Sequence, residues 1–288
     1  MKTDKALLSA YKKVRKVLGN KGLGKLLIIK SINEKAISKI HSDSITINGH
    51  KMFLDPSDSL NLTINEVYEP FETSLLFYEI KNGDIVLDIG AHIGYYTLIM
   101  ASLVGDRGKV FAFEPEPSNF NLLKKNLESN GYQNIVLENK AVSDKNGYTN
   151  LYLCKDNSGM HRIYPSKYCE GQIKVDEIKL DDYFMDSDLK NKISVVKIDV
   201  EGTELDVLEG LKEILKNPQI KLFLEFIPDS IKEYHSRPNE LLEFLLSQEF
   251  SISCINEGEK KIEHFSDISK ITELYPEGIN LFCKKIIP

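Results

Sequence analysis

A glycine-containing turn between two short apolar segments constrains this chain more than any other feature. The turn runs from Gly90 to Gly94 and follows Ile85–Leu87, an apolar run typical of a strand buried on both faces. A helical pattern occupies 95–103, and a second apolar strand leads to Glu114. The order of strand, glycine turn, helix, strand and acidic residue indicates an α/β fold that binds a nucleoside.

The residues around the turn favour a cationic nucleoside over a dinucleotide. A dinucleotide fingerprint places a second glycine two residues after Gly90, where this chain has His92. Asp88 would repel a pyrophosphate but favour an ammonium group, and Glu114 can accept hydrogen bonds from a ribose. A ribose joined to a cationic amino acid indicates S-adenosylmethionine. Acidic residues at strand ends also cap the following helix, so a structural role for Asp88 and Glu114 stays open.

The rest of the chain alternates between strand and helix patterns. This alternation predicts a doubly wound α/β domain over 45–288, with a mostly parallel, seven-stranded sheet. An Asn-Gly turn predicts an N-terminal hairpin over 45–55, and 147–182 reads as an inserted hairpin with a polar loop. The predicted strands of the sheet lie at 85–87, 110–113, 135–137, 193–199, 221–226, 251–255 and 279–284.

Charge is distributed unevenly. Residues 1–40 contain 11 Lys/Arg and 2 Asp/Glu, a net charge of +9. Because the whole chain has a net charge of −6, residues 41–288 have a net charge of −15. Apolar residues at helical spacing predict a basic helical segment over 1–44. Such a helix can contact an anionic membrane or an acidic partner through residues 1–30, or pack its apolar stripe on the domain. The acidic body argues against nucleic-acid binding.

The sequence predicts a cytoplasmic protein. It contains no apolar run of about 18 residues that would span a membrane and no recognisable signal peptide. Its cysteines, Cys154, Cys169, Cys254 and Cys283, show no C-x-x-C metal spacing. Cys154 and Cys169 can face each other in the inserted hairpin, but reduced thiols are the expected state in a cytoplasmic protein.

The motifs, taken in order, resemble the FkbM type of class I S-adenosylmethionine-dependent methyltransferase over about residues 45–285. The family usually has Asn where this chain has His92. The resemblance implies a Rossmann-like fold and methyl transfer to an oxygen, often a hydroxyl on a sugar or secondary metabolite, without fixing the acceptor. The matching segments are 68–70, 83–84, 88–98, 112–115, 180–183, 197–204 and 224–225.

Candidates for the chemical step follow the later strands. Lys197, Asp199 and Glu201 are spaced by two and share a face if the strand stays extended. Lys197 either assists the reaction or pairs with a carboxylate and holds the loop. Glu225 ends the fifth strand, and His161, in the polar loop of the inserted hairpin, has the right pKa for a general base. Asp199 and Glu201 can bind a divalent ion, but no full ligand set is evident, so no metal is expected.

The cofactor site is predicted at the carboxyl ends of the first strands. Glu114 would bind the ribose, the 90–94 turn would approach the methionine, and Lys140 and Ala141 would lie beside the adenine. The candidate cofactor-binding residues are Glu69, Glu72, Thr73, Asp88, Gly90, Ala91, His92, Gly94, Tyr95, Glu114, Pro115, Asn119, Lys140, Ala141 and Asp199. The leading function is O-methylation of a small-molecule hydroxyl. The alternatives are a nicotinamide-dependent oxidoreductase and a non-enzymatic nucleoside-binding module.

Overall fold

A computed structural model describes residues 43–154, 157–235 and 237–286 of the chain. The predicted basic helix, and the contact expected through residues 1–30, lie outside the described residues. The chain divides into two compact units, Met1–Tyr68 and Glu69–Pro288, and each is described by itself. The boundary predicted at residues 44 and 45 falls inside the first unit.

The described part of the first unit is a hairpin followed by one helical turn. Strands β1 (Ser44–Ile47) and β2 (His50–Phe53) pair antiparallel. Asn48 and Gly49, between them, both have positive φ, as the favoured two-residue hairpin turn requires. The carboxylate of Asp58 then accepts the backbone N–H groups of Leu62 and Thr63, which starts helix α3 (Leu62–Asn65).

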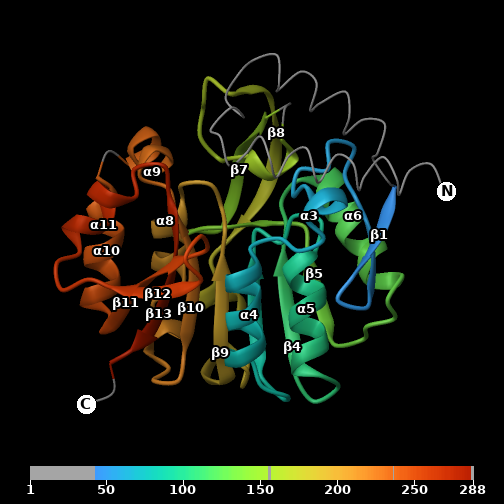
Figure 1. The fold of residues 1–288 in the computed structure, drawn as a ribbon, viewed down its shortest axis with the longest axis horizontal. Coiled ribbons are helices and arrows are strands. Elements are labelled where there is room, and N and C mark those ends of the chain that lie inside the picture. Colours follow the sequence, from blue (N-terminus) through green and yellow to red (C-terminus); the bar gives the residue numbers. More distant parts are fainter. Residues whose placement is uncertain (1–42, 155–156, 236, 287–288) are drawn as a thin grey trace. The chain divides into compact units, whose positions relative to one another are not determined.

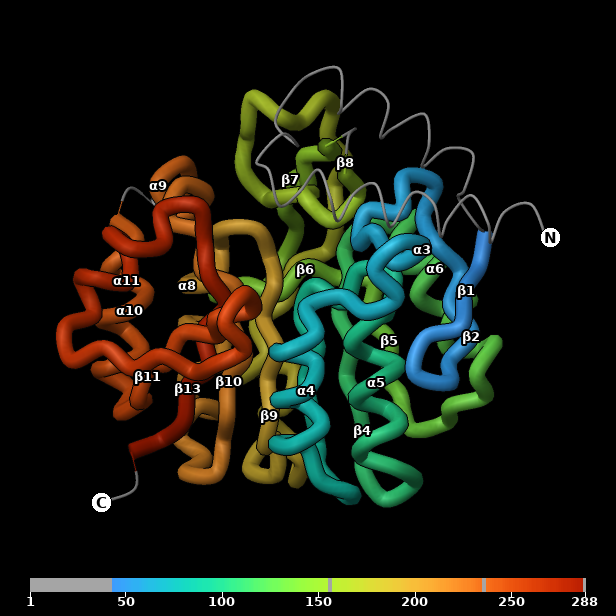
Figure 2. The backbone as a smooth tube through the Cα atoms, in the orientation of Figure 1, coloured from blue at the N-terminus to red at the C-terminus, as the bar shows by residue number. Residues whose placement is uncertain are grey.

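The second unit contains the remaining elements (Figures 1 and 2). Its strands are β3 (Ile85–Ile89), β4 (Lys109–Phe113), β5 (Ile135–Glu138), β6 (Ala141–Val142), β7 (Gly147–Cys154), β8 (Cys169–Ile178), β9 (Ile193–Ile198), β10 (Lys221–Phe226), β11 (Phe250–Asn256), β12 (Lys261–His264) and β13 (Ile279–Lys285). Its helices are α4 (Pro70–Glu79), α5 (Tyr95–Val104), α6 (Pro117–Glu128), α7 (Leu180–Tyr183), α8 (Glu204–Gly210), α9 (Pro228–His235), α10 (Pro238–Ser247) and α11 (Ser269–Leu274), with 3-10 turns η2 (Ser158–Met160), η3 (Lys190–Lys192) and η4 (Ile214–Lys216).

The main sheet confirms the predicted fold class and adds one strand. Within the described residues it has eight strands, in the order β12-β11-β13-β10-β9-β3-β4-β5. Neighbours from β10 to β5 pair parallel, and β13, β11 and β12 pair antiparallel. The prediction of seven strands missed β12, a short, mostly polar strand that pairs only with β11. An edge strand lacks the apolar run by which buried strands are recognised.

Alternating side chains divide the core between the two faces of the sheet. In β4, Phe111 and Phe113 join the larger core, which includes residues of α7, α8 and α10. Ala112, between them, packs with residues of α5 and α6 on the other face. This is the period of two that a strand buried on both faces requires. Helices α4 and α5 lie side by side on one face of the sheet (Figures 1 and 2).

The inserted hairpin forms a separate three-stranded sheet in the order β6-β8-β7 (Figure 1). Cys154 and Cys169 are paired in the register of β7 and β8 and form a disulfide. The expectation of reduced thiols is therefore wrong for this pair, because the hairpin brings the two cysteines directly opposite one another. Cys254 and Cys283 are free and buried.

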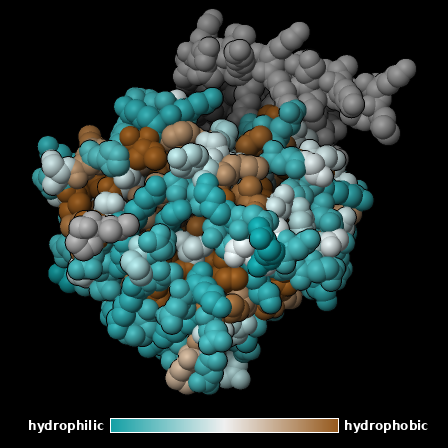
Figure 3. Space-filling view, turned by 90° about the horizontal axis from the view of Figure 1, so that it is seen from below, coloured by the Kyte–Doolittle hydropathy of each residue, from teal (hydrophilic) through white to brown (hydrophobic). Residues whose placement is uncertain are grey.

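A helix that spans a membrane needs about 20 consecutive, predominantly apolar residues. Among the described residues, no helix combines the length and the apolar character needed to cross a bilayer. The face drawn in Figure 3 is mostly hydrophilic, and its apolar residues occur in separate groups.

Candidate active site

The order in which the chain adds strands to the sheet changes direction between β3 and β9. From β3 the chain continues to β4 and β5 on one side, and later to β9 and β10 on the other. The carboxyl ends of strands at such a switch point are where open α/β sheets bind ligands. The turn after β3 and the turn after β9 meet there. They contain the predicted residues Gly90, Ala91, His92 and Gly94 in the first turn, and Asp199 and Glu201 in the second.

Gly90 is required because these two turns touch through their backbones. Its φ is +84°, and a Cβ atom at this position would lie 1.8 Å from the backbone oxygen of Asp199. The N–H groups of Gly90 and Ala91 both donate to the carbonyl of Phe113, which ties the turn to the end of β4. Gly94 is the residue that precedes α5. The glycine signal in the sequence therefore reflects a close backbone approach.

Glu114 is held in a fixed orientation at the end of β4. Its Oε2 accepts the N–H of His92 at 2.8 Å, and its Oε1 accepts the N–H of Glu116 at 2.9 Å. Burial raises the pKa of Glu114 to about 7, although these two N–H groups oppose the shift. Each carboxylate oxygen keeps acceptor capacity beyond its backbone partner. The group therefore fits the two hydroxyls of a ribose.

Asp88 is tied to the helix that follows the glycine turn. It is buried, and it accepts a hydrogen bond from the hydroxyl of Thr97 at 2.5 Å. Burial raises the pKa of Asp88 to about 6, against the hydrogen bond from Thr97. Nearby, the hydroxyls of Thr73 and Tyr95 lie 3.3 Å apart. The structure thus gives Asp88 a role in anchoring α5, and its contact with an ammonium group stays a prediction.

The loop of the inserted hairpin contacts the cofactor turn. His92 Nε2 lies 2.9 Å from Ser158 Oγ, and the side-chain amide of Asn119 donates to the carbonyl of Ser158. Asn119 lies in the first turn of α6, where its backbone N–H donates to the side chain of Glu116, the residue that caps this helix. The sequence did not single out Ser158. His92, which stands where the family usually has Asn, therefore contacts a residue that lies 66 positions later in the chain, Ser158.

The predicted adenine-side residues follow β5. The amide of Asn139 donates to the carbonyls of Glu114 and Pro115, which fixes this turn against the end of β4. Lys140 is paired with Glu138 at 3.0 Å. Ala141 is buried in β6.

Lys197 is the centre of a buried group of carboxylates. Its ammonium lies 3.0 Å from Asp199 Oδ2, 3.9 Å from Glu72 Oε1 and 4.5 Å from the centre of the Tyr96 ring. Burial alone would lower the pKa of Lys197, but the charges of Asp199, Glu72 and Glu69 raise it well above its usual value. Lys197 is therefore a charged residue that pairs with carboxylates, the second of the two roles considered from the sequence.

Asn280, on β13, completes this group. Its amide donates to Glu69 Oε1 at 2.8 Å and to Glu72 Oε2 at 2.5 Å, and Tyr96 donates to Glu69 Oε2 at 2.6 Å. Burial still raises the pKa of Glu72 to about 8, against the attraction of Lys197. The predicted residues Glu69 and Glu72 thus lie with Lys197 and Asp199, two strands away from Glu114.

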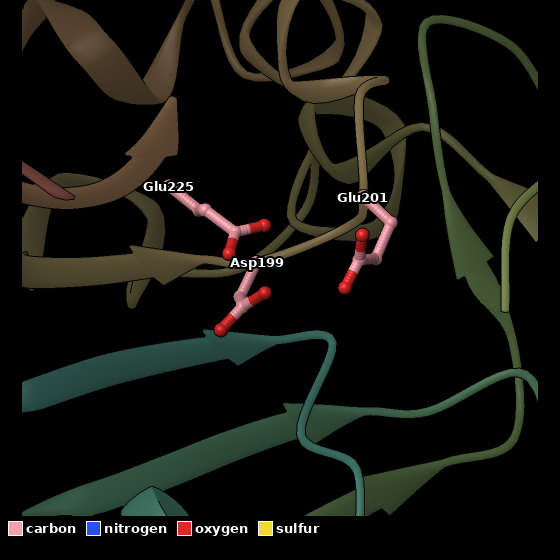
Figure 4. Close-up of side chains that lie close together, drawn as sticks. All are labelled: Asp199, Glu201 and Glu225. Atoms are coloured by element: carbon pink, nitrogen blue, oxygen red, sulfur yellow. The ribbon is translucent and has the colours of Figure 1, made fainter. Parts of the chain in front are cut away.

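A second acidic group, formed by Asp199, Glu201 and Glu225, lies at the ends of β9 and β10. One oxygen from each carboxylate can be chosen so that the three lie within 4.8 Å of one another (Figure 4). Arg162, from the inserted loop, lies 3.4 Å from Glu201 Oε2. Burial raises the pKa of Glu201 to about 8, with the charge of Asp199 adding to the shift and Arg162 opposing it. Burial and the neighbouring carboxylates also raise the pKa of Glu225.

The ring of His161 contacts the backbone of its own hairpin rather than the acidic group. Its Nδ1 accepts the backbone N–H of Cys154 at 3.0 Å, and burial lowers its pKa, with Glu116 the charged group that opposes the shift. The described contacts of its ring include none with the acidic group of Asp199, Glu201 and Glu225. The next residue, Arg162, makes that contact instead. The role of His161 as a general base stays a prediction, and Arg162 is the residue of this loop that contacts Glu201.

Three further residues of the site had weak signals or none. Arg162 lies in the polar loop that was noted for His161, so the loop was the only signal. Tyr96 lies within the matching segment 88–98, but nothing in that motif indicated that it would bind Glu69. Asn280 lies in an ordinary strand, 208 residues from Glu72. No local pattern predicts a partner at that separation.

This geometry defines a class of protein: an α/β domain with a glycine turn at the switch point and a buried carboxylate held at the end of the neighbouring strand. The chain belongs to the family of methyltransferase FkbM domains, whose model matches residues 88–252. Membership confirms the predicted family and its cofactor, S-adenosylmethionine. The fixed orientation of Glu114 is compatible with that cofactor.

Named relatives are similar over part of their length. A hexuronic acid methyltransferase, AglP, from Haloferax volcanii is 30% identical over 143 residues, which cover 50% of this chain and 56% of the relative. Methyltransferase 1 from Beauveria bassiana is 25% identical over 146 residues, 44% of this chain and 58% of the relative. The chain thus spans little more than half of either. A solved methyltransferase FkbM from Methylobacillus flagellatus is 15% identical with a TM-score of 0.44, covering 89% of this chain and 59% of that one.

Proposed function

We propose that this protein transfers the methyl group of S-adenosylmethionine to a hydroxyl oxygen of a small molecule, such as a sugar. The observation that carries the proposal is the position of Glu114. Two backbone N–H groups hold its carboxylate at the end of β4, beside the glycine turn. The name of the Haloferax volcanii relative supports a sugar acid as one form of acceptor.

The cofactor supplies a methyl group already activated by a sulfonium. The chain's own residues therefore act mainly by positioning. We assign Glu114 to the ribose, the turn from Gly90 to Gly94 to the methionine part, and the segment after β5, with Lys140 and Ala141, to the adenine. Glu69, Glu72 and Thr73 shape the region beside the methionine part.

The acceptor is assigned to the side of β9 and β10. Asp199, Glu201 and Glu225 would face its hydroxyl, with Lys197 and Arg162 as positioning residues that hold Asp199 and Glu201. His161, the general base suggested by the sequence, already accepts a hydrogen bond at one ring nitrogen. The substitution His161→Gln tests its role. We expect it to leave kcat within about threefold, far less than the 10² or more that loss of a general base costs.

The first test is calorimetry on the full chain with S-adenosylhomocysteine and, separately, with NAD. We expect S-adenosylhomocysteine alone to bind. Binding of NAD alone would favour the oxidoreductase alternative, and binding of neither would favour the non-enzymatic alternative.

The second test identifies the acceptor. The protein is incubated with a metabolite extract and S-adenosylmethionine carrying an isotopically labelled methyl group. We expect a small molecule that contains a hydroxyl to gain the label and one methylene unit of mass. Label found only on nitrogen or carbon would contradict O-methylation.

A further inference from the structure

The acidic group at the ends of β9 and β10 is built from two separate segments. Asp199 and Glu201 lie in the turn after β9, and Glu225 lies near the end of β10. Figure 4 shows the three side chains entering a common space, with one oxygen of each within 4.8 Å of the others. Three like charges at this separation repel one another strongly where water is excluded. The three side chains can therefore remain close together only with retained protons or with compensating positive charge.

Two cations already lie beside the group, and each is bound to a particular oxygen. Lys197 lies 3.0 Å from Asp199 Oδ2 and Arg162 lies 3.4 Å from Glu201 Oε2. Lys197 also pairs with Glu72, and Arg162 also pairs with Glu233. These two cations therefore do not balance the three carboxylates when all three are ionised. Glu204, whose Oε1 accepts the N–H of Gly202, is a further acidic neighbour of Glu225.

Glu225 is the member of the group that lacks a donor. Its Oε2 atom is buried from solvent, and no hydrogen-bond partner for it exists among the described residues. A buried carboxylate oxygen without a donor costs free energy that a folded protein normally recovers through a partner. The side chain is directed at Asp199 and Glu201, whose nearest oxygens are acceptors as well (Figure 4). A single divalent cation can satisfy one oxygen of each carboxylate at the same time.

We propose that Asp199, Glu201 and Glu225 bind a divalent metal ion of the oxygen-preferring class, Mg²⁺ or Mn²⁺. The three ligands are carboxylates, without the imidazole or thiolate that selects zinc or copper. Mg²⁺ sites commonly use a few carboxylates and complete their coordination with water and substrate oxygens. Such an ion would replace the donor that Glu225 lacks.

The consequence for chemistry rests on the proposed function. A bound divalent ion would hold the acceptor oxygen and lower the pKa of its hydroxyl. The hydroxyl proton leaves to water, a bond forms between the oxygen and the methyl carbon, and the bond between that carbon and sulfur breaks. S-adenosylhomocysteine then departs as a neutral thioether. A separate general base is not required, which agrees with the contacts of His161.

The test measures ion binding without methyl transfer. Full-length protein is treated with EDTA, desalted and titrated with Mn²⁺ while paramagnetic resonance follows the free ion, and Mg²⁺ is then added as competitor. We expect one site that Mg²⁺ displaces. Glu225→Gln should weaken Mn²⁺ binding at least tenfold. Glu209→Gln, at an exposed carboxylate paired with Lys212, should not change it.

Two outcomes would overturn the proposal. One is the absence of Mn²⁺ binding at millimolar concentration, the weak end of protein sites for such ions. The other is equal binding by wild-type protein and Glu225→Gln. If Glu225→Gln fails to fold by circular dichroism, Glu201→Gln replaces it with the same expectation. Binding of S-adenosylhomocysteine is measured on the same preparations, so that failure of the ion site is distinguished from failure of the proposed function.

Discussion

The guanidinium of Arg162 contacts the carboxylate of Glu201, although the two residues are 39 positions apart. Arg162 lies in the loop between β7 and β8, and Glu201 lies in the turn after β9. Arg162 is 3% exposed, and it also lies 3.5 Å from Glu233 and donates to the hydroxyl of Tyr164. Tyr164 in turn donates to the carbonyls of Glu201 and Ser230. The inserted loop is therefore fixed to the turn after β9 by a buried charged contact.

Arg162→Met should destabilise the protein, because it leaves the buried carboxylate of Glu201 without its cation. Breaking a buried pair in this way typically costs about 3 kcal/mol, which urea unfolding will detect. Arg237→Met is the matched control, since that side chain is 74% exposed and forms an ion pair with Glu240 three residues later. An equal loss of stability in both variants would contradict the buried role of Arg162.

Gly90→Ala should lower both the thermal stability and the affinity for S-adenosylhomocysteine. The new Cβ would collide with the backbone oxygen of Asp199 and would also sit at a positive φ. Overpacking adds about 1–3 kcal/mol to the cost of the backbone strain. Gly131→Ala separates the two effects, because Gly131 has φ of +74° and no atom lies within 4 Å of its added Cβ. If the Tm decreases by the same amount in both variants, the close approach of Gly90 to Asp199 is not the cause of the destabilisation.

Glu114→Gln should weaken S-adenosylhomocysteine binding by roughly tenfold at pH 8, since hydrogen bonds to a charged group contribute about 1.5–3 kcal/mol. The pKa of Glu114 is raised to about 7, so the ligand-free protein holds this group mostly protonated at pH 6. Affinity in the wild type should therefore rise as the pH increases through 7, and Glu114→Gln should lose that rise. Calorimetry at pH 6, 7 and 8 tests this. Glu128→Gln, exposed at the end of α6, should keep the wild-type profile.

Glu79→Gln should reduce stability at neutral pH and leave it unchanged in acid. Glu79 accepts a hydrogen bond from Lys284 at 2.8 Å and pairs with Lys221 at 3.0 Å. Burial acts to raise its pKa, but these lysines outweigh burial and hold the pKa below 4.5. A lowered folded-state pKa contributes stability above the unfolded value, and that contribution disappears as the pH falls through the folded value.

Urea unfolding at pH 7, 5 and 4 measures the effect of Glu79→Gln. We expect a difference from wild type of about 1 kcal/mol at pH 7, reduced because both lysines are partly exposed. The difference should shrink at pH 4. Glu213→Gln, at an exposed carboxylate paired with Lys216, should have a smaller effect. A difference that grows in acid would contradict the assignment.

Much of the fold was predictable, because its strongest signals are local. The apolar run of β3, the glycine turn, α5 and the strand ending at Glu114 follow one another in sequence, and neighbouring strands must place their ends at one edge of the sheet. Strand β12 was missed because an edge strand needs no apolar run. The disulfide was missed because the expected redox compartment, rather than the pairing register of β7 and β8, decided that prediction.

The sequence by itself determined which residues stand at the ends of strands, and therefore that Asp88, Glu114, Asp199 and Glu225 collect at one edge of the main sheet. It also indicated a protein that binds S-adenosylmethionine, since turn chemistry and strand order are properties of short segments. Only the tertiary structure decided how those side chains are paired. Asn280 reaches Glu69 and Glu72 across more than 200 residues, and Arg162 rather than His161 contacts Glu201. Glu225 Oε2 has no hydrogen-bond donor among the residues that the structure describes. Such pairings depend on how distant loops pack and where each side chain points, and no spacing along the chain encodes either.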